Sequence, residues 1–251
     1  MFVHYRSQGI VLNEKEKGEA DKLLAVYTKE FGKIILLGKG VRKINSKLRS
    51  GIQSLSLSEI EFIQGKFYKT LTDAFLIDSF SALKKEPQKL KVAYRIIETL
   101  DSLLKEQEKE ERLWQLLTEL LKKLSEEKFS ANQLPFLYYY FFWNLAEILG
   151  YRPELYGCAS CRKRLMPDNL FFSVPQGGAI CSACAKKALS RKESLLNIDA
   201  GAIKILRLIF RKDWETISRL EAISFSQENL KRISAQFFRF YLPKKQILNK
   251  N

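Results

Sequence analysis

The spacing of four cysteines constrains this chain more than any other feature of its sequence. They form two pairs, Cys158-Ala-Ser-Cys161 and Cys181-Ser-Ala-Cys184, with nineteen residues between the pairs. A zinc ion binds four thiolates at tetrahedral corners, about 2.3 Å from each sulfur, and each Cys-x-x-Cys pair supplies two of them. The spacing therefore predicts that residues 151–192 form a small module in which both pairs bind one Zn²⁺ ion. Gly177-Gly178 between the pairs suits a hairpin that carries the second pair back to the first.

Two disulfides or a redox-active pair are the competing interpretations of these cysteines. The N-terminal sequence MFVHYRSQGIVLNE lacks the apolar segment and the small-residue cleavage site of a secretory signal. We therefore expect the chain to be cytoplasmic, where stable disulfides are rare. Redox Cys-x-x-Cys motifs normally occur once. Because protein would fill all four metal positions, no water could be activated, and we expect a structural ion and not a catalytic one.

The balance of charge indicates which kind of partner the chain binds. Its 251 residues are 46% hydrophobic, enough for a folded core, and 43 Lys and Arg stand against 28 Asp and Glu, a net charge of +15. By segment the net charge is +4 over residues 1–80, zero over 81–150, +6 over 151–192 and +5 over 193–251. This balance is typical of proteins that bind polyanions, although many basic proteins bind nothing acidic.

The first 80 residues have the pattern of a small β-barrel. Short apolar segments alternate with turn residues such as Gly32 and Gly65. Five short strands favour a small barrel or a sandwich. Because Leu55 and Leu57 differ in parity from Ile60 and Phe62, we expect a bulge in the fourth strand. The five predicted strands are Gly9–Leu12, Lys22–Thr28, Lys33–Leu37, Ser54–Ile63 and Phe67–Ile77.

Between the third and fourth strands lies GKGVRKINSKLRSG, residues 38–51, which has five basic side chains and no acidic one. A phosphate backbone, an acidic protein surface or water alone are the candidates for what it contacts. The module around the cysteines is similarly basic, with Lys186, Lys187, Arg191 and Lys192 near the second pair and three consecutive basic residues after the first. Such density favours anion binding.

Beyond residue 80 the apolar period becomes helical. Residues 90–104 and 113–124 repeat apolar residues every three or four positions, and so do residues 203–210 and 230–241. The segment LPFLYYYFFWNLAEILG is apolar on every face, which predicts a central buried helix ending at Gly150. It is too short for the roughly 20 residues of a membrane span. The fold class is therefore α+β, with domains at 1–80 and at 81–251, the second interrupted by the module.

The sequence lacks the usual catalytic patterns. His4 is the only histidine, so a histidine-ligated catalytic metal site cannot form. Between Gly32 and Gly38-Lys39 stand five residues and not the four of a phosphate-binding P-loop, and Gly40 replaces its hydroxyl residue. We therefore expect a protein without enzymatic activity.

Taken together, these segments resemble the RecO family of bacterial DNA repair and recombination mediators. The likeness rests on GIVLNEKEKGEADKLLAVYTKEFGKI, on GKGVRKINSK and on the four cysteines that follow LAEILGYRPEL, and it covers nearly the whole chain. It implies an N-terminal OB-fold, a helical domain and an embedded zinc module. It also implies binding of single- and double-stranded DNA, strand annealing, and work beside RecR and the single-stranded DNA-binding protein to load RecA, at the nucleoid and without catalysis.

In an OB-fold, loops and strand faces form a groove that follows a nucleic-acid backbone, so the basic stretch is expected to contact phosphates. An RNA-binding zinc-ribbon factor and an adaptor for acidic protein tails remain open alternatives. The candidate metal ligands are Cys158, Cys161, Cys181 and Cys184, and the candidate DNA contacts are Lys39, Arg42, Lys43, Lys47, Arg49, Arg162, Lys163 and Arg164.

Overall fold

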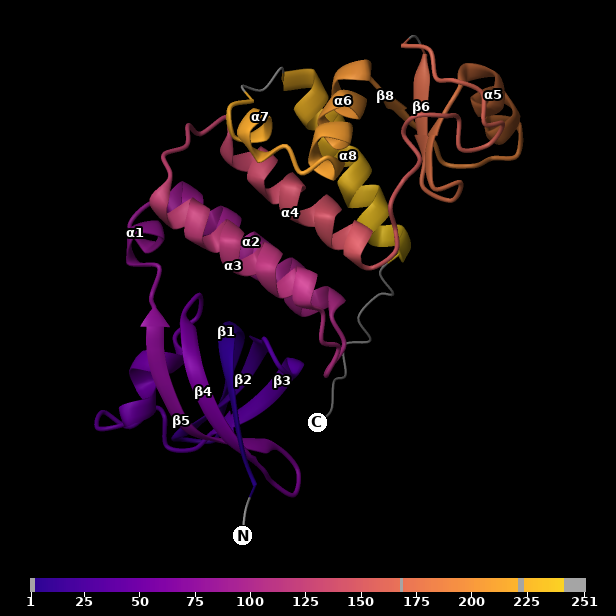
Figure 1. Cartoon of the computed structure of the whole chain (residues 1–251). Coiled ribbons are helices and arrows are strands. Elements are labelled where there is room, and N and C mark those ends of the chain that lie inside the picture. The colour runs from indigo at the N-terminus through magenta and orange to yellow at the C-terminus, as the bar shows by residue number, and fades with distance from the viewer. Residues whose placement is uncertain (1–2, 168, 221–223, 242–251) are drawn as a thin grey trace. The chain divides into compact units, whose positions relative to one another are not determined.

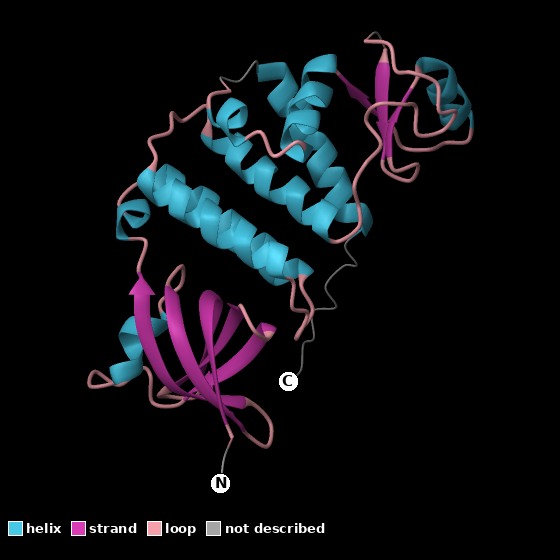
Figure 2. Cartoon of the chain, viewed as in Figure 1, coloured by secondary structure: helices cyan, strands magenta, loops and turns pink. Residues whose placement is uncertain are grey.

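The computed structural model describes residues 3–167, 169–220 and 224–241 (Figure 1). The chain divides into two compact units, residues 1–128 and 129–251. Figure 2 shows strands in an N-terminal barrel and in a small module, with helices in the remainder. Within the described residues, no helix is both long and apolar enough to cross a membrane.

Five strands close the N-terminal barrel in the order β1-β2-β3-β5-β4, with β4 also paired to β1. The closing pair, β3 with β5, is parallel, and every other pair is antiparallel. Alternate side chains point inward and bury a core that includes Leu24, Ile34 and Phe62. The predicted five-stranded barrel is confirmed. The strands are β1 (His4–Lys17), β2 (Asp21–Thr28), β3 (Gly32–Gly38), β4 (Leu57–Gln64) and β5 (Lys69–Asp78).

β1 is much longer than the predicted Gly9–Leu12. Its second half pairs with the start of β2, from Asn13 opposite Ala25 to Lys17 opposite Asp21. These residues are charged and mostly exposed, so apolar periodicity does not reveal them. The pairing shifts by one residue between Val11 and Asn13. The second half of β1 thus continues as a polar, mostly exposed strand beside the partly buried start of β2.

The prediction of a bulge in the fourth strand is wrong, because the irregularity lies in the fifth strand. The β4–β5 register moves from Leu57–Asp78 to Ser58–Leu76 and later from Glu61–Asp73 to Phe62–Leu71, so the extra residues belong to β5. Leu55, which suggested the change of parity, precedes β4 and has a left-handed backbone with φ of 57°. The change of parity therefore marks where the strand begins.

Three helices complete the first unit: α1 (Ser81–Lys84), α2 (Pro87–Leu103) and α3 (Glu111–Glu126). The linker between α2 and α3 lies against the start of β3. Lys33, which is only 8% exposed, forms an ion pair of 2.7 Å with Asp101, and Gly32 leaves no room for a Cβ beside the Glu108 carbonyl. The two predicted helices are confirmed. The division at residue 80 marks the end of the barrel, whose independence from α2 and α3 stays a prediction.

The second unit is built around α4 (Leu134–Ile148), in which eleven of the fifteen residues are buried. Trp143 is completely buried and contacts Phe172, Phe210 and Phe237. The helix stops before Gly150, whose φ of 86° is the left-handed conformation that glycine adopts most easily. The predicted central helix is therefore confirmed. Around it lie α6 (Ala200–Phe210), α7 (Trp214–Ser218) and α8 (Ser224–Tyr241).

Inserted between α4 and α6 is the small module that holds the cysteines. β6 (Leu170–Ser173) pairs with β7 (Gly178–Ile180) on one side and with β8 (Leu196–Ile198) on the other, and α5 (Ser182–Ser190) follows β7. The turn between β6 and β7 has Gly177 at φ of 73°. This is the hairpin predicted from the two adjacent glycines, and it returns the second cysteine pair to the first.

Asp199 caps α6 and ties it to α8. Its carboxylate accepts hydrogen bonds from the Ala202 amide at 3.2 Å, the Asn229 side chain at 2.9 Å and the Ser226 hydroxyl at 2.5 Å. Burial raises the pKa of Asp199, but these hydrogen bonds outweigh it and lower the pKa below the usual value. A depressed pKa in the folded state adds stability that is present above the pKa of the unfolded chain and lost as pH falls.

We therefore expect Asp199→Ala to destabilise the second unit by about 1–2 kcal/mol at pH 7, as for other lost helix caps. The difference from wild type should shrink as the pH falls below about 4, the ordinary pKa of an aspartate in an unfolded chain. Urea unfolding of both proteins, at pH 7 and below pH 4, measures this difference in stability. A difference that stays constant with pH would contradict the role given to the charge.

Candidate metal centre and nucleic-acid interface

The four cysteine sulfurs converge, with all Sγ atoms within 4.8 Å of one another. Cys161 and Cys181 lie 3.9 Å apart. Four sulfurs bound to one zinc ion at 2.3 Å would be separated by about 3.8 Å. The donor set and its spacing therefore fit one tetrahedral metal ion, and the predicted ligands come together in one place.

Each cysteine pair is held by a local turn. In the first, the Cys158 amide donates to the Lys163 carbonyl at 2.7 Å and the Arg162 amide donates to the Cys158 carbonyl at 2.8 Å, with Arg162 left-handed at φ of 64°. In the second, Cys181 is the N-cap of α5 and Cys184 lies in its first turn. The positive end of a helix dipole favours thiolates at this position.

The backbone also prepares Cys158 to lose its proton. Burial raises the pKa of this thiol, but amide donors from Cys161, Cys181 and Ser160 lower it to about 6. The pKa of Cys184 moves in the opposite direction: the Ser160 side chain lowers it, while burial and the other three cysteines raise it above its usual value. Four neighbouring thiolates repel one another, so a bound cation is what allows all four to ionise.

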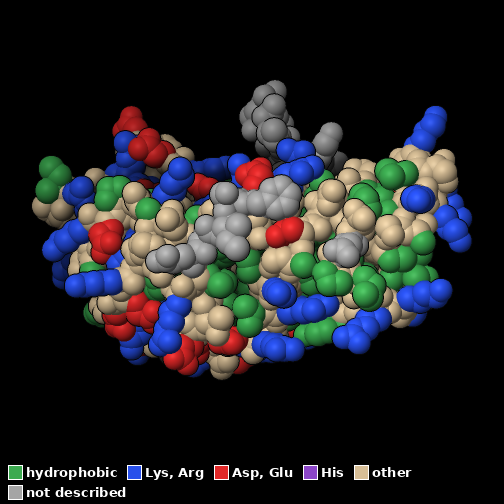
Figure 3. All heavy atoms as spheres, turned by 90° about the horizontal axis from the view of Figure 1, so that it is seen from above, with side chains coloured by type: hydrophobic (Ala, Val, Ile, Leu, Met, Phe, Trp, Pro, Cys, Tyr) green, Lys and Arg blue, Asp and Glu red, His purple; other side chains and the backbone are tan. Residues whose placement is uncertain are grey.

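The basic side chains of the module are exposed and free of acidic partners. Apart from Arg152, which pairs with Glu147, none of them forms an ion pair with a carboxylate among the described residues. At the right-hand end of Figure 3, where the module lies, Lys and Arg appear on the visible face without Asp or Glu. These exposed residues are Arg162, Lys163, Arg164, Lys186, Lys187, Arg191 and Lys192.

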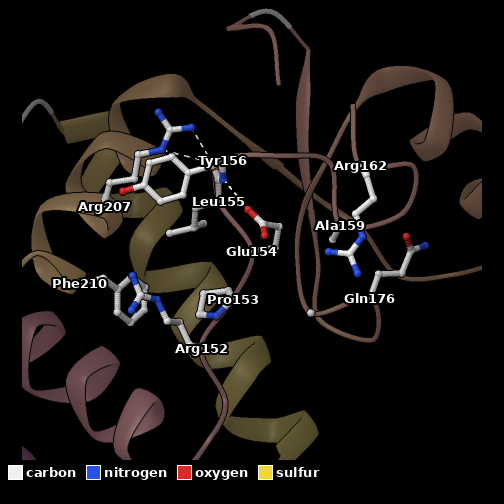
Figure 4. Close-up of a pocket in the computed structure, with 11 residues that line it drawn as sticks. Arg152, Pro153, Glu154, Leu155, Tyr156, Ala159, Arg162, Gln176, Arg207 and Phe210 are labelled. Carbon is white, nitrogen blue, oxygen red and sulfur yellow. Dashed lines mark hydrogen bonds between the residues drawn. The ribbon is translucent and has the colours of Figure 1, made fainter. Parts of the chain in front are cut away.

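Arg162 also borders a cavity of about 480 Å³ against α6 (Figure 4). Two further arginines lie there, but each is already engaged. Arg207 donates to the Leu155 carbonyl at 2.6 Å and covers the Tyr156 ring, while Arg152 pairs with a glutamate at 2.6 Å. Of the three, Arg162 is the one whose side chain makes no hydrogen bond or ion pair within the described residues. Sequence patterns did not single out this cavity, because its walls come from separate segments.

On the barrel, the basic stretch is anchored from both ends. The Gly40 amide donates to the Asp21 carboxylate at 2.8 Å, and the Arg42 amide donates to the Ala20 carbonyl at 3.0 Å. Val41 enters the barrel core, and the stretch ends in a 3-10 helix, η1 (Lys47–Ile52), with Ile52 buried. The loop is therefore attached to the barrel, and its five cations, Lys39, Arg42, Lys43, Lys47 and Arg49, are all exposed.

One of these five cations is not free. Arg42 forms an ion pair of 3.2 Å with Glu16 and donates to the Gly18 carbonyl at 3.3 Å. With Arg49 it lines a cavity of about 560 Å³ that also contains Lys22 and Lys84. Burial lowers the pKa of Lys84, and the charge of Asp78 opposes this only in part. Lys22 and Lys84 were missed as candidates because neither lies within a basic run.

Comparison with known families agrees with this architecture. The model for Recombination protein O, N terminal, matches residues 1–80, and the model for Recombination protein O, C terminal, matches residues 85–248. The chain belongs to the RecO family.

Two RecO relatives show how far the similarity extends. A DNA repair protein RecO from Dehalococcoides mccartyi is 30% identical over 217 residues, which cover 86% of this chain and 82% of the relative. Another, from Thermoanaerobacter sp., is 28% identical over 238 residues and covers 94% and 92% of the two chains. The similarity thus includes the barrel, the helices and the module of this RecO chain.

Proposed function

We propose that this RecO chain is a non-enzymatic recombination mediator of DNA repair. It binds single- and double-stranded DNA without sequence preference, anneals complementary strands, and helps to load RecA together with RecR and beside the single-stranded DNA-binding protein. It acts in the cytoplasm at the nucleoid. The observation that carries this proposal is the presence of two groups of exposed cations, on the barrel and on the module, in a chain whose relatives are named DNA repair proteins.

In this proposal the cations contact the phosphate groups of DNA. Lys and Arg side chains on flexible stems neutralise the backbone and carry no information about base identity. In this proposal residues 1–80 are the OB-fold DNA-binding domain, and Arg162, Lys163 and Arg164 extend the interface within the helical domain of residues 81–251. Binding is therefore expected to tolerate any sequence.

One structural Zn²⁺ ion completes the module. The residues that would hold it are Cys158, Cys161, Cys181 and Cys184, which fill all four positions of a tetrahedral site. Such a closed site leaves no position for a reactive water, so the ion supplies folding energy and not catalysis. Its role is to keep the basic side chains of the module in one place.

Annealing needs two polyanions to approach while their repulsion is screened. The two cation groups belong to different compact units, residues 1–128 and 129–251, separated in sequence by a segment of zero net charge. Each group offers a binding place for one strand. Condensed counterions released from both strands favour the bound state at low salt.

Charge reversal on the barrel tests the phosphate contacts. Lys39, Lys43 and Lys47 are suitable because they are exposed and have no acidic partner within the described residues, whereas Arg42 is tied to Glu16. If about five phosphates are neutralised on single strands, the log–log salt slope of binding should be about −3.5, and changing the three lysines to Glu should bring it to about −1.4 or weaker. Fluorescence anisotropy with oligo(dT) measures both slopes.

A matched control reverses three exposed lysines outside the basic stretch, Lys105, Lys109 and Lys128, and so changes the net charge equally. This variant should keep most of the wild-type slope. Equal losses in both variants would mean that overall charge, and not the loop, attracts DNA. A wild-type slope near zero would contradict phosphate-led binding altogether, and competition with a matched RNA oligomer separates a DNA-binding protein from an RNA-binding one.

A further inference from the structure

The loop between β4 and β5 exposes two adjacent aromatic rings. Phe67 is 82% exposed, more than any other aromatic residue described, and Tyr68 is 37% exposed. The sequence pattern placed both in the fifth strand, but β5 begins only at Lys69, so neither ring is part of the barrel wall. Single exposed apolar side chains are common on protein surfaces. The surroundings of these two rings are what distinguish them.

A lysine lies beside each ring. Lys17 Nζ, from the end of β1, is 3.7 Å from the centroid of the Tyr68 ring, and Lys66 Nζ is 5.4 Å from that of Phe67. Neither lysine forms an ion pair with any acid in the described chain. The nearby acids Glu14 and Glu16 are neutralised by Lys22 at 3.0 Å and Arg42 at 3.2 Å. Each ring therefore has a lysine beside it that no carboxylate in the described chain pairs with.

The backbone holds this loop in a tight turn. A Cβ at Gly65 would collide with the Tyr68 carbonyl, so only glycine permits the approach of these two segments. The Gln64 side chain donates to the Gly65 carbonyl at 3.1 Å. Because β5 pairs with β3 through Lys69 opposite Leu36, the loop joins the sheet close to where β3 leads into the basic stretch. The rings and the basic stretch thus belong to the same barrel.

We propose that Phe67 and Tyr68 form a stacking platform for the bases of single-stranded DNA, with Lys17 and Lys66 contacting the adjacent phosphates. This proposal rests on the proposed DNA-binding function and adds to it a means of preferring single strands. Every base has a π-face, so stacking tolerates any sequence. In a duplex the bases already stack on one another, so the rings gain nothing from paired DNA.

The test compares two probes of equal length and charge, oligo(dT) and an abasic oligomer with the same sugar-phosphate backbone. Wild type should bind oligo(dT) roughly tenfold more tightly or better, since each stacked base contributes that much. Phe67→Ala with Tyr68→Ala should remove this preference and leave binding of the abasic oligomer unchanged. The salt slope on oligo(dT) should also stay unchanged, because stacking releases no counterions.

Two further variants make the test specific. Phe75→Ala removes another exposed ring, 61% exposed and well along β5, and should behave as wild type. Phe67→Trp keeps a stacking surface and should retain the preference for oligo(dT). If wild type binds both probes equally, or if the double alanine variant keeps the preference, the stacking platform is overturned while DNA binding stands. If wild type binds neither probe, the proposed DNA-binding function itself is wrong.

Discussion

Replacing Cys158 with serine is expected to abolish metal binding and to unfold the module formed by residues 151–192. The core cluster around the cysteines has only four buried residues, Cys158, Ile180, Ala185 and Ala188, too few to stabilise a domain of this size. A structural zinc site contributes about 10–16 kcal/mol at neutral pH in small metal-dependent domains. Losing one of the four ligands therefore removes most of the free energy that stabilises the folded module.

Elemental analysis should find about one zinc ion in the wild-type chain, as expected for a closed four-thiolate site, and almost none in the variant. Trypsin should then cleave at the exposed Lys and Arg residues of the module, such as Lys186 and Arg191. The barrel should remain resistant, because it belongs to a different compact unit.

Ser182→Ala serves as the control for this experiment. Ser182 is exposed and stands next to Cys181 at the start of α5, so its replacement changes the same turn without removing a ligand. This variant should keep the zinc and the wild-type digestion pattern. A Cys158→Ser protein with full zinc content and unchanged resistance to trypsin would mean that the ion is not structural.

Replacing Trp143 with alanine is expected to lower the free energy of unfolding of the second unit by about 3–5 kcal/mol, as for other buried tryptophans. The ring is completely buried on α4 and contacts Phe172 in the module, Phe210 on α6 and Phe237 on α8. Removing it opens a cavity where all three meet, and these elements cannot collapse together to refill it. Chemical denaturation followed by circular dichroism measures the change.

The Trp143→Phe variant distinguishes the contribution of side-chain packing from that of the polar indole N–H group. The buried indole Nε1 has no hydrogen-bond partner among the described atoms, so the native ring already bears the cost of an unpaired donor. Phenylalanine keeps most of the contacts and removes that donor, and we expect a loss below about 1.5 kcal/mol. If both variants lost the same stability, the cavity argument would be wrong.

Local patterns predicted much of this fold. The apolar character of residues 134–150 on every face was enough to place a buried central helix there, because a helix without a polar stripe has no side to expose. The two glycines at 177 and 178 predicted the hairpin of the module in the same way. The convergence of the four cysteines followed from their spacing, since each pair lies in a turn of a few residues.

Other features could not be read from local patterns. The polar half of β1 looked like a loop, because its partner strand supplies hydrogen bonds and not an apolar core. Phe67 and Tyr68 looked like strand residues, because aromatic side chains favour strands. Their place in a turn depends on Gly65 approaching the Tyr68 carbonyl.

By itself, the sequence determined the types of the elements, the four candidate metal ligands and the excess of basic residues, because periodicity, spacing and charge are properties of short segments. Only the tertiary structure decided which cations are free to bind: Arg42 is tied to Glu16, and Lys33 is buried against Asp101, 68 residues away. Such pairings join residues that chain folding brings together. The free energy of a charged side chain depends on these neighbours and on its burial, and the residue's own segment of sequence determines neither.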